Sequence, residues 1–119
     1  MNLPNISNFY KDFVYPKEFQ KILHCNLVDL GIWYLMTEKQ VETRIQGLQK
    51  RYPHRKLIPF ARRDDGDDIA CFEIGQKDSV QIIHDFSMEG YEQREKYKTF
   101  WDWFRYALEL FINTDEDLD

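Results

Sequence analysis

The sequence predicts an α+β fold, in which an antiparallel meander sheet is packed on one face by helices and an aromatic C-terminal helix follows the sheet. Three observations support this prediction. Runs rich in β-branched and aromatic residues follow one another at residues 56–61, 68–74 and 79–86. Segments with apolar residues three and four positions apart precede them, as expected of amphipathic helices. A strongly aromatic segment at residues 100–113 comes after the last run.

The chain before the β-type runs predicts helices and one extended segment. Apolar residues at helical spacing predict a short helix over residues 6–13, and Pro16 suits the first turn of a second helix. Residues 28–36 are mostly aliphatic and aromatic and predict a strand or an extended segment. Thr37-x-x-Gln40 has the pattern of a capping box, which predicts a further helix that ends at Pro53.

The joins between the β-type runs have the composition of hairpin loops. Residues 62–67 and 75–78 contain the Gly and Asp residues that such loops favour. Pro59 lies inside the first run and cannot donate a ladder hydrogen bond, so this strand either lies at an edge or carries a bulge. The polar residues 87–98 predict a connection that leads into the last helix.

The aromatic segment predicts a helix with a single narrow polar face. Thr99 and Asp102 give it a start that resembles a capping box. Nearly all its other side chains are apolar, so we expect the helix to be covered on most sides and to hold the fold together rather than bind a partner. The residues of the polar face, three or four positions apart, are Asp102, Arg105, Glu109 and Asn113.

Length and composition predict one compact domain. The 119 residues allow a domain over residues 1–114, followed by an acidic tail, residues 115–119, that we expect to be disordered. A hydrophobic content of 43% is typical of a globule, and no apolar run reaches the roughly 18 residues of a membrane span. The first residues lack the features of a secretion signal, so we expect a cytoplasmic protein. Cys25 and Cys71 have no metal-site spacing and are expected to be free thiols.

Charge is distributed unevenly along the chain. Residues 44–63 carry arginine and lysine but no acid, whereas residues 64–89 carry many acids and a single lysine. One interpretation is a dipolar surface that favours a charged macromolecular partner. The other is an ordinary solvated helix end followed by a charged hairpin loop. The net charge of −5 and the placement of aromatic residues in core positions disfavour nucleic-acid binding.

The sequence predicts no catalytic, cofactor-binding or metal-binding residues. It has no phosphate-binding glycine loop and no nucleophile elbow. The acidic run from Asp64 to Asp68 lacks the ligand spacing of a calcium loop, so we interpret it as a charged turn. One alternative remains from a different class of protein, a small hydrolase or transferase that uses a Cys71–His84 dyad across the predicted hairpin.

Several motifs in order resemble the SUKH superfamily, known from the yeast cell-wall glucan synthesis regulator (SMI/KNR type). Tyr15-Pro16-Lys-Glu-Phe19 is similar to the entry into the family's early helix. Leu57-Ile-Pro-Phe-Ala61, the acidic turn and Ile69-Ala-Cys-Phe-Glu-Ile74 follow in the family's order. His84-Asp85 and the aromatic helix complete the resemblance, which covers roughly Tyr15 to Ile112.

The resemblance implies a monomeric, non-enzymatic protein-binding domain without a cofactor. Bacterial members are mostly immunity proteins that neutralise a cognate secreted or contact-delivered toxin, often a nuclease, by direct association. Other members are regulators or scaffolds, which gives a second interpretation. An acidic loop would complement a basic toxin site. The residues predicted to contact the partner are Arg62, Arg63, Asp64, Asp65, Asp67, Asp68, Glu89 and Tyr91.

Overall fold

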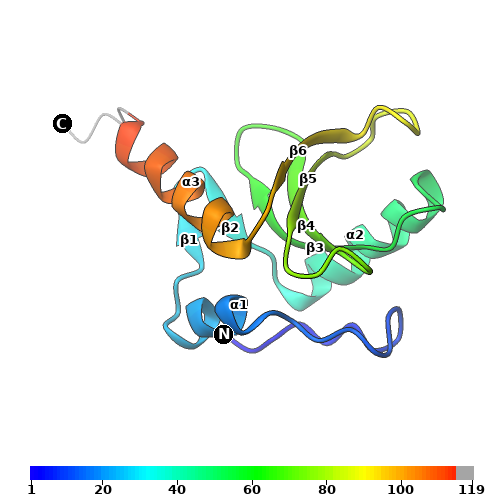
Figure 1. The fold of residues 1–119 in the computed structure, drawn as a ribbon, viewed down its shortest axis with the longest axis horizontal. Helices are drawn as coiled ribbons and strands as arrows, with labels where there is room; N and C mark the ends of the chain where they lie inside the picture. The colour runs from blue at the N-terminus through cyan, green and yellow to red at the C-terminus, as the bar shows by residue number, and fades with distance from the viewer. Residues whose placement is uncertain (115–119) are drawn as a thin grey trace.

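The computed structural model describes residues 1–114 as three helices and six strands (Figure 1). The acidic tail expected to be disordered, residues 115–119, lies outside the described residues. The elements, in chain order, are α1 (Lys17–His24), β1 (Asp29–Leu30), β2 (Trp33–Leu35), α2 (Glu38–Arg51), β3 (Leu57–Arg63), β4 (Asp68–Glu73), β5 (Val80–His84), β6 (Gln93–Tyr97) and α3 (Phe100–Asn113).

The strands form one antiparallel meander in which each strand pairs with its neighbour in sequence. The order across the sheet is β1-β2-β3-β4-β5-β6. This arrangement confirms the predicted α+β class, the meander and the aromatic last helix. Pro59 lies in β3, which is an inner strand, and the register with β4 shifts between Pro59 and Ala61. Of the two alternatives for Pro59, the bulge is therefore correct.

The inner strands are buried on both faces, because side chains of both parities along β3, β4 and β5 are excluded from solvent. On one face, Phe72 of β4 packs against Phe19 of α1 and Phe100 of α3, with ring centroids 5.6 and 6.1 Å apart. Cys71 points to the other face, which α2 covers (Figure 1). The helices thus flank the sheet on two sides, which refines the prediction of a single covered face.

Local signals placed α1 and α2 correctly. Pro16 directly precedes α1. At the start of α2 both halves of the capping box form, since the Gln40 amide donates to Thr37 Oγ1 at 3.3 Å and the Thr37 amide donates to Gln40 Oε1 at 2.8 Å. These bonds satisfy two amides that the first turn of a helix leaves free.

Three sequence expectations were wrong. Residues 6–13 form turns, closed by bonds such as that from the Phe9 amide to the Ile6 carbonyl at 2.9 Å, rather than a helix. Residues 28–36 are split into β1 and β2 by a turn at Gly31, whose φ of +86° is readily adopted only by glycine. The expected polar connection 87–98 contains strand β6.

The aromatic helix α3 is less enclosed than predicted. Thr99 caps it by accepting a bond from the Asp102 amide at 3.2 Å. Its fully buried residues, Phe100, Trp103 and Ala107, lie on one side. In its last turn, however, Phe111 and Ile112 are 53% and 74% exposed. The side chain of Phe111 rests on Gly31, where an added Cβ would lie only 2.6 Å from the ring. The helix is therefore a half-buried cover over the sheet.

Within residues 1–114, no helix combines the length and the hydropathy that crossing a membrane requires.

Candidate functional site

Three turns lie along one end of the sheet. They are the β1–β2 turn at residues 31–32, the acidic β3–β4 turn at residues 64–67, and the β5–β6 loop at residues 85–92 (Figure 1). The Asp64 amide donates to the Ile32 carbonyl at 2.8 Å, and the Asp85 amide donates to the Asp67 carbonyl at 3.2 Å. We call these residues the loop end. All the contact residues predicted from the sequence therefore lie at or beside the same end of the domain.

Arg63 and Asp65 neutralise each other within the acidic turn. Arg63 Nε and Nη2 lie 2.7 and 2.9 Å from the two carboxylate oxygens of Asp65. The bond from Arg63 is the main cause that lowers the pKa of Asp65 below its ordinary value. Arg63 also donates to the Tyr106 hydroxyl at 3.3 Å and lies 5.7 Å from the centre of the Trp33 ring. Most hydrogen-bond donors of Arg63 are therefore already engaged within the domain.

Asp68 and Arg62 also have partners within the domain. Asp68 Oδ1 lies 3.0 Å from His84 Nδ1 and 3.5 Å from Arg94 Nε. The guanidinium of Arg62 lies over the ring of Tyr34, 4.9 Å from its centre. Asp68 is therefore paired, whereas Arg62 packs on a ring and keeps its positive charge without a carboxylate partner among the described residues.

Three of the predicted acids remain unneutralised. Asp64, Asp67 and Glu89 are exposed, and within residues 1–114 their carboxylates form no ion pair. The loop end thus carries a surplus of negative charge, because these three acids outnumber Arg62, the one predicted contact arginine that has no carboxylate partner among the described residues.

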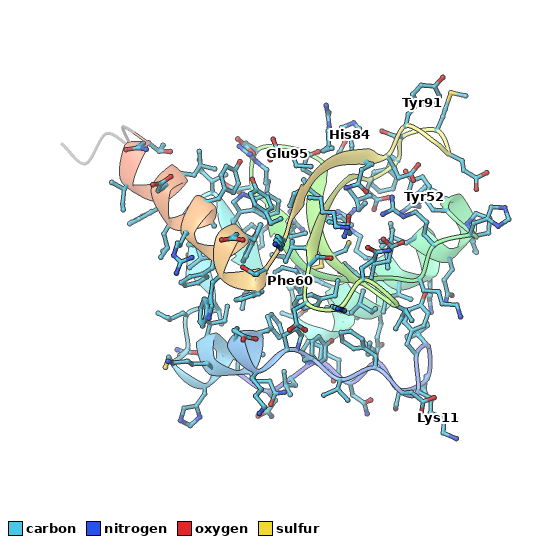
Figure 2. The ribbon with its side chains drawn as sticks, in the orientation of Figure 1. Lys11, Tyr52, Phe60, His84, Tyr91 and Glu95 are labelled. Atoms are coloured by element: carbon cyan, nitrogen blue, oxygen red, sulfur yellow. The ribbon has the colours of Figure 1, made fainter. Side chains whose placement is uncertain are left out.

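The β5–β6 loop exposes a group of large apolar side chains. Phe86, Met88 and Tyr91 are 59%, 77% and 77% exposed, and Tyr91 projects from the outer end of the loop (Figure 2). We call these residues the apolar tip. Sequence reasoning selected Tyr91 but missed the other two. A signal was present for Met88, which interrupts the polar connection 87–98, whereas Phe86 falls within the predicted β-type run 79–86.

A buried carboxylate holds the first half of this loop. Asp85 has no solvent exposure, and its oxygens accept from Arg44 Nη1 at 2.6 Å and from Arg51 Nε at 2.8 Å. The same carboxylate accepts from the Phe86 amide at 2.8 Å. Charge-assisted bonds of this kind are stronger than neutral ones and fix geometry. Helix α2 therefore determines where the loop leaves β5.

The backbone of Phe86 adopts a conformation that is rare for a bulky residue. Its φ is +72°, which for a residue with a large side chain is strained. The guanidinium of Arg51 lies over its ring at 4.3 Å and that of Arg44 at 5.3 Å. The Tyr52 hydroxyl donates to the Ser87 carbonyl at 2.7 Å. These contacts stabilise the strained turn.

Glu92 holds the second half of the loop. Its carboxylate accepts from Arg55 Nη1 at 3.0 Å and from the Gly90 amide at 2.7 Å. Partial burial raises the pKa of Glu92, but the hydrogen bonds from backbone amides and from Arg55 outweigh it and lower the pKa overall. Arg55 is itself fixed by Glu73, with both contacts at 2.9 Å. The loop is therefore held at both of its ends.

The structure contradicts the Cys71–His84 dyad. Asp68 pairs with His84 and Cys71 pairs with Gln81, so the two candidate side chains lie on opposite faces of the sheet. Cys71 is fully buried, and burial raises the pKa of its thiol, which disfavours the nucleophilic thiolate. A nucleophile and a base on opposite faces cannot exchange a proton directly.

A cavity of about 340 Å³ lies between α3 and the adjoining face of the sheet. Its lining mixes guanidinium and carboxylate groups with phenol rings, so it selects neither a cation nor an anion. The lining residues are Trp33, Arg63, Asp68, Ile82, Arg94, Glu95, Tyr97 and Tyr106. Elsewhere in residues 1–114, no cluster of His, Cys, Asp and Glu side chains has the arrangement of a metal site.

Comparison of the chain with models of protein families, with curated proteins and with solved structures found no match.

Proposed function

We propose that this domain is a non-enzymatic protein-binding module of the SUKH-like type, and that it acts as an immunity protein. It neutralises a cognate toxin domain in the cytoplasm by direct association through the loop end. This function is the one implied by the sequence resemblance, and the arrangement of the loop end supports it.

The single observation that carries the proposal is the combination of unneutralised acids and exposed apolar side chains on a rigidly held surface. Asp64, Asp67 and Glu89 supply the charge, and the apolar tip supplies surface that gains free energy when water is removed from it. An enzyme site would instead require convergent catalytic groups, and the one dyad that the sequence offered is not assembled.

The chemistry of the loop end favours a basic partner. Opposite charge accelerates encounter and aligns the two proteins, and the effect weakens as salt increases. The active sites of nucleases are basic because they bind phosphates. A nuclease toxin domain is therefore the class of partner that best complements this surface.

The proposal is tested by co-expressing the chain with the product of the adjacent gene and measuring association of the purified proteins. Wild-type protein is expected to form a stable complex and to protect cells from the toxin. The variant Asp64→Asn/Asp67→Asn is expected to associate more slowly, by about threefold to tenfold, and with a weaker dependence on salt.

The matched control is Asp12→Asn/Asp78→Asn. It removes the same net charge from exposed positions outside the loop end, so its association rate at low salt is expected to stay closer to that of the wild type. Equal effects of the two double variants would exclude the acidic turn as a contact. A chain that ignores the adjacent product but binds an endogenous regulator would instead be a scaffold of the second type that the resemblance implies.

A further inference from the structure

We propose that the apolar tip, rather than the acidic turn, is the energetic centre of docking, and that the partner presents an apolar socket rimmed by lysine or arginine. This inference rests on the proposed function, since it names the chemistry of the partner at the same surface. It also assigns Asp85, whose side chain is fully buried, the role of a positioning residue.

Exposed apolar surface is concentrated in the β5–β6 loop. Phe86, Met88 and Tyr91 lie within a single loop, and each exposes more than half of its surface. Apolar side chains exposed one at a time are ordinary, as Val14 illustrates at 78%. Exposed Tyr, Phe and Met side chains in one loop have the composition of the residues that are enriched in the cores of protein interfaces.

The β5–β6 loop is preorganised for binding. Ordering a flexible loop on binding subtracts from affinity, whereas a loop already held in its bound shape avoids that loss. Here the carboxylates of Asp85 and Glu92 fix the two ends of the loop through Arg44, Arg51 and Arg55. Because both ends of the loop are fixed, the apolar tip is held exposed to solvent rather than packed against the domain.

The backbone of the loop is strained at Phe86. Phe86 keeps a positive φ although a glycine would adopt it without strain. The phenylalanine ring contributes contacts with the two arginines and a large exposed surface, neither of which a glycine could provide. Strain retained at an exposed aromatic residue fits a requirement for that side chain in binding.

Charge selects the occupant of this surface. A second copy of the chain would bring its own Asp64, Asp67 and Glu89 against the same acids across a two-fold axis, which is repulsive. A membrane with anionic lipids would repel the same residues. An apolar socket with a basic rim is attracted by the acids while it buries the tip.

The test uses the full chain and the purified product of the adjacent gene, with active-site residues of that product inactivated. The variant Met88→Ser/Tyr91→Ser is expected to bind at least about 30-fold more weakly, almost entirely through faster dissociation. The control Val14→Ser removes an equally exposed apolar side chain from the N-terminal segment and is expected to change affinity less than about twofold. Glu89→Gln is expected to slow association without accelerating dissociation.

Asp85 is tested by the same measurement with a structural readout beside it. Asp85→Asn is expected to weaken binding while nuclear magnetic resonance shows increased motion confined to residues 85–92. Restoring rigidity should restore affinity. An engineered disulfide that links the two ends of the loop in this variant is therefore expected to recover binding. Weakened binding without added motion would overturn the positioning role.

The outcomes separate this inference from the proposed function. A wild-type complex that tolerates Met88→Ser/Tyr91→Ser within about twofold overturns the inference and leaves the proposed function intact. Absence of any wild-type complex overturns both. Sedimentation of the chain alone that reveals a dimer dispersed by the tip variant would assign the surface to a second copy. Binding to phosphatidylserine vesicles that the tip variant abolishes would assign it to a membrane.

Discussion

The acidic turn and the β5–β6 loop lie at the same end of the sheet but are held in opposite ways. The acidic turn is short, and two of its carboxylates, those of Asp64 and Asp67, extend into solvent without an ion-pair partner among the described residues. The longer loop has buried carboxylates at Asp85 and Glu92 and exposes apolar side chains between them. The charge available to a partner and the charge that builds the surface therefore belong to different residues.

The largest expected effect comes from the carboxylate that builds the surface. Asp85→Asn leaves Arg44 and Arg51 partly buried beside a neutral group, so the free energy of unfolding should fall by about 2–4 kcal/mol. Urea denaturation measures this change. In an Arg44→Gln/Arg51→Gln background the same substitution should cost clearly less, because the stranded charges are gone. A loss below about 1 kcal/mol in the wild-type background would contradict the distinction between the two loops.

An intermediate effect is expected when low pH protonates Glu92, at the other end of the loop. The pKa of Glu92 is lower in the folded protein than its ordinary value of 4.5, so the folded state favours the ionised form. Its contribution to stability is therefore complete above pH 4.5 and is lost as pH falls through the lowered native pKa. The resonance of the Gly90 amide, which donates to Glu92, should report this loss.

The variant Glu92→Gln provides the control for the pH experiment. It should remove the acid-dependent step at the Gly90 amide while leaving the rest of the spectrum in place. A step that persists unchanged in Glu92→Gln would mean that another carboxylate controls the loop.

The smallest effect is expected from the acids that do not build the surface. Asp64→Asn/Asp67→Asn should change the free energy of unfolding by less than about 0.5 kcal/mol, because neither side chain has a stabilising partner among the described residues. Thermal unfolding compared with the wild type checks this. Destabilisation by more than about 1 kcal/mol would show that the turn is structural and would remove the contrast between the loops.

Sequence reasoning succeeded where the signal was local. The capping box at Thr37 and Gln40 lies within one helical turn, and the bulge at Pro59 follows from the chemistry of one residue. Strand β6 was missed because it is an edge strand whose residues, Gln93–Tyr97, are nearly all polar and exposed. Charged edge strands hide the alternation that identifies a strand, and they also discourage pairing with other proteins.

The sequence predicts some residues of the candidate site but not the long-range bonds that hold the loop in place. The acidic turn and Tyr91 stand out in the sequence, and the structure brings them to the same end of the sheet. The bonds that hold the loop join Asp85 to residues 41 and 34 positions earlier in the chain. Periodicity and spacing contain no information about such pairs, so only the fold reveals that Asp85 is structural while Asp64 and Asp67 form no ion pair within residues 1–114.

The contact between Gly31 and Phe111 bears on how the chain folds as it is synthesised. All neighbouring strands of the meander are consecutive in sequence, so they can pair as each emerges from the ribosome. Helix α3 is made after every strand, and it supplies Phe100 and Trp103 to the core and the ring that rests on Gly31. Until α3 is released, α1 is the only helix on this apolar face of the nascent sheet, and the last helix completes the cover and the first hairpin.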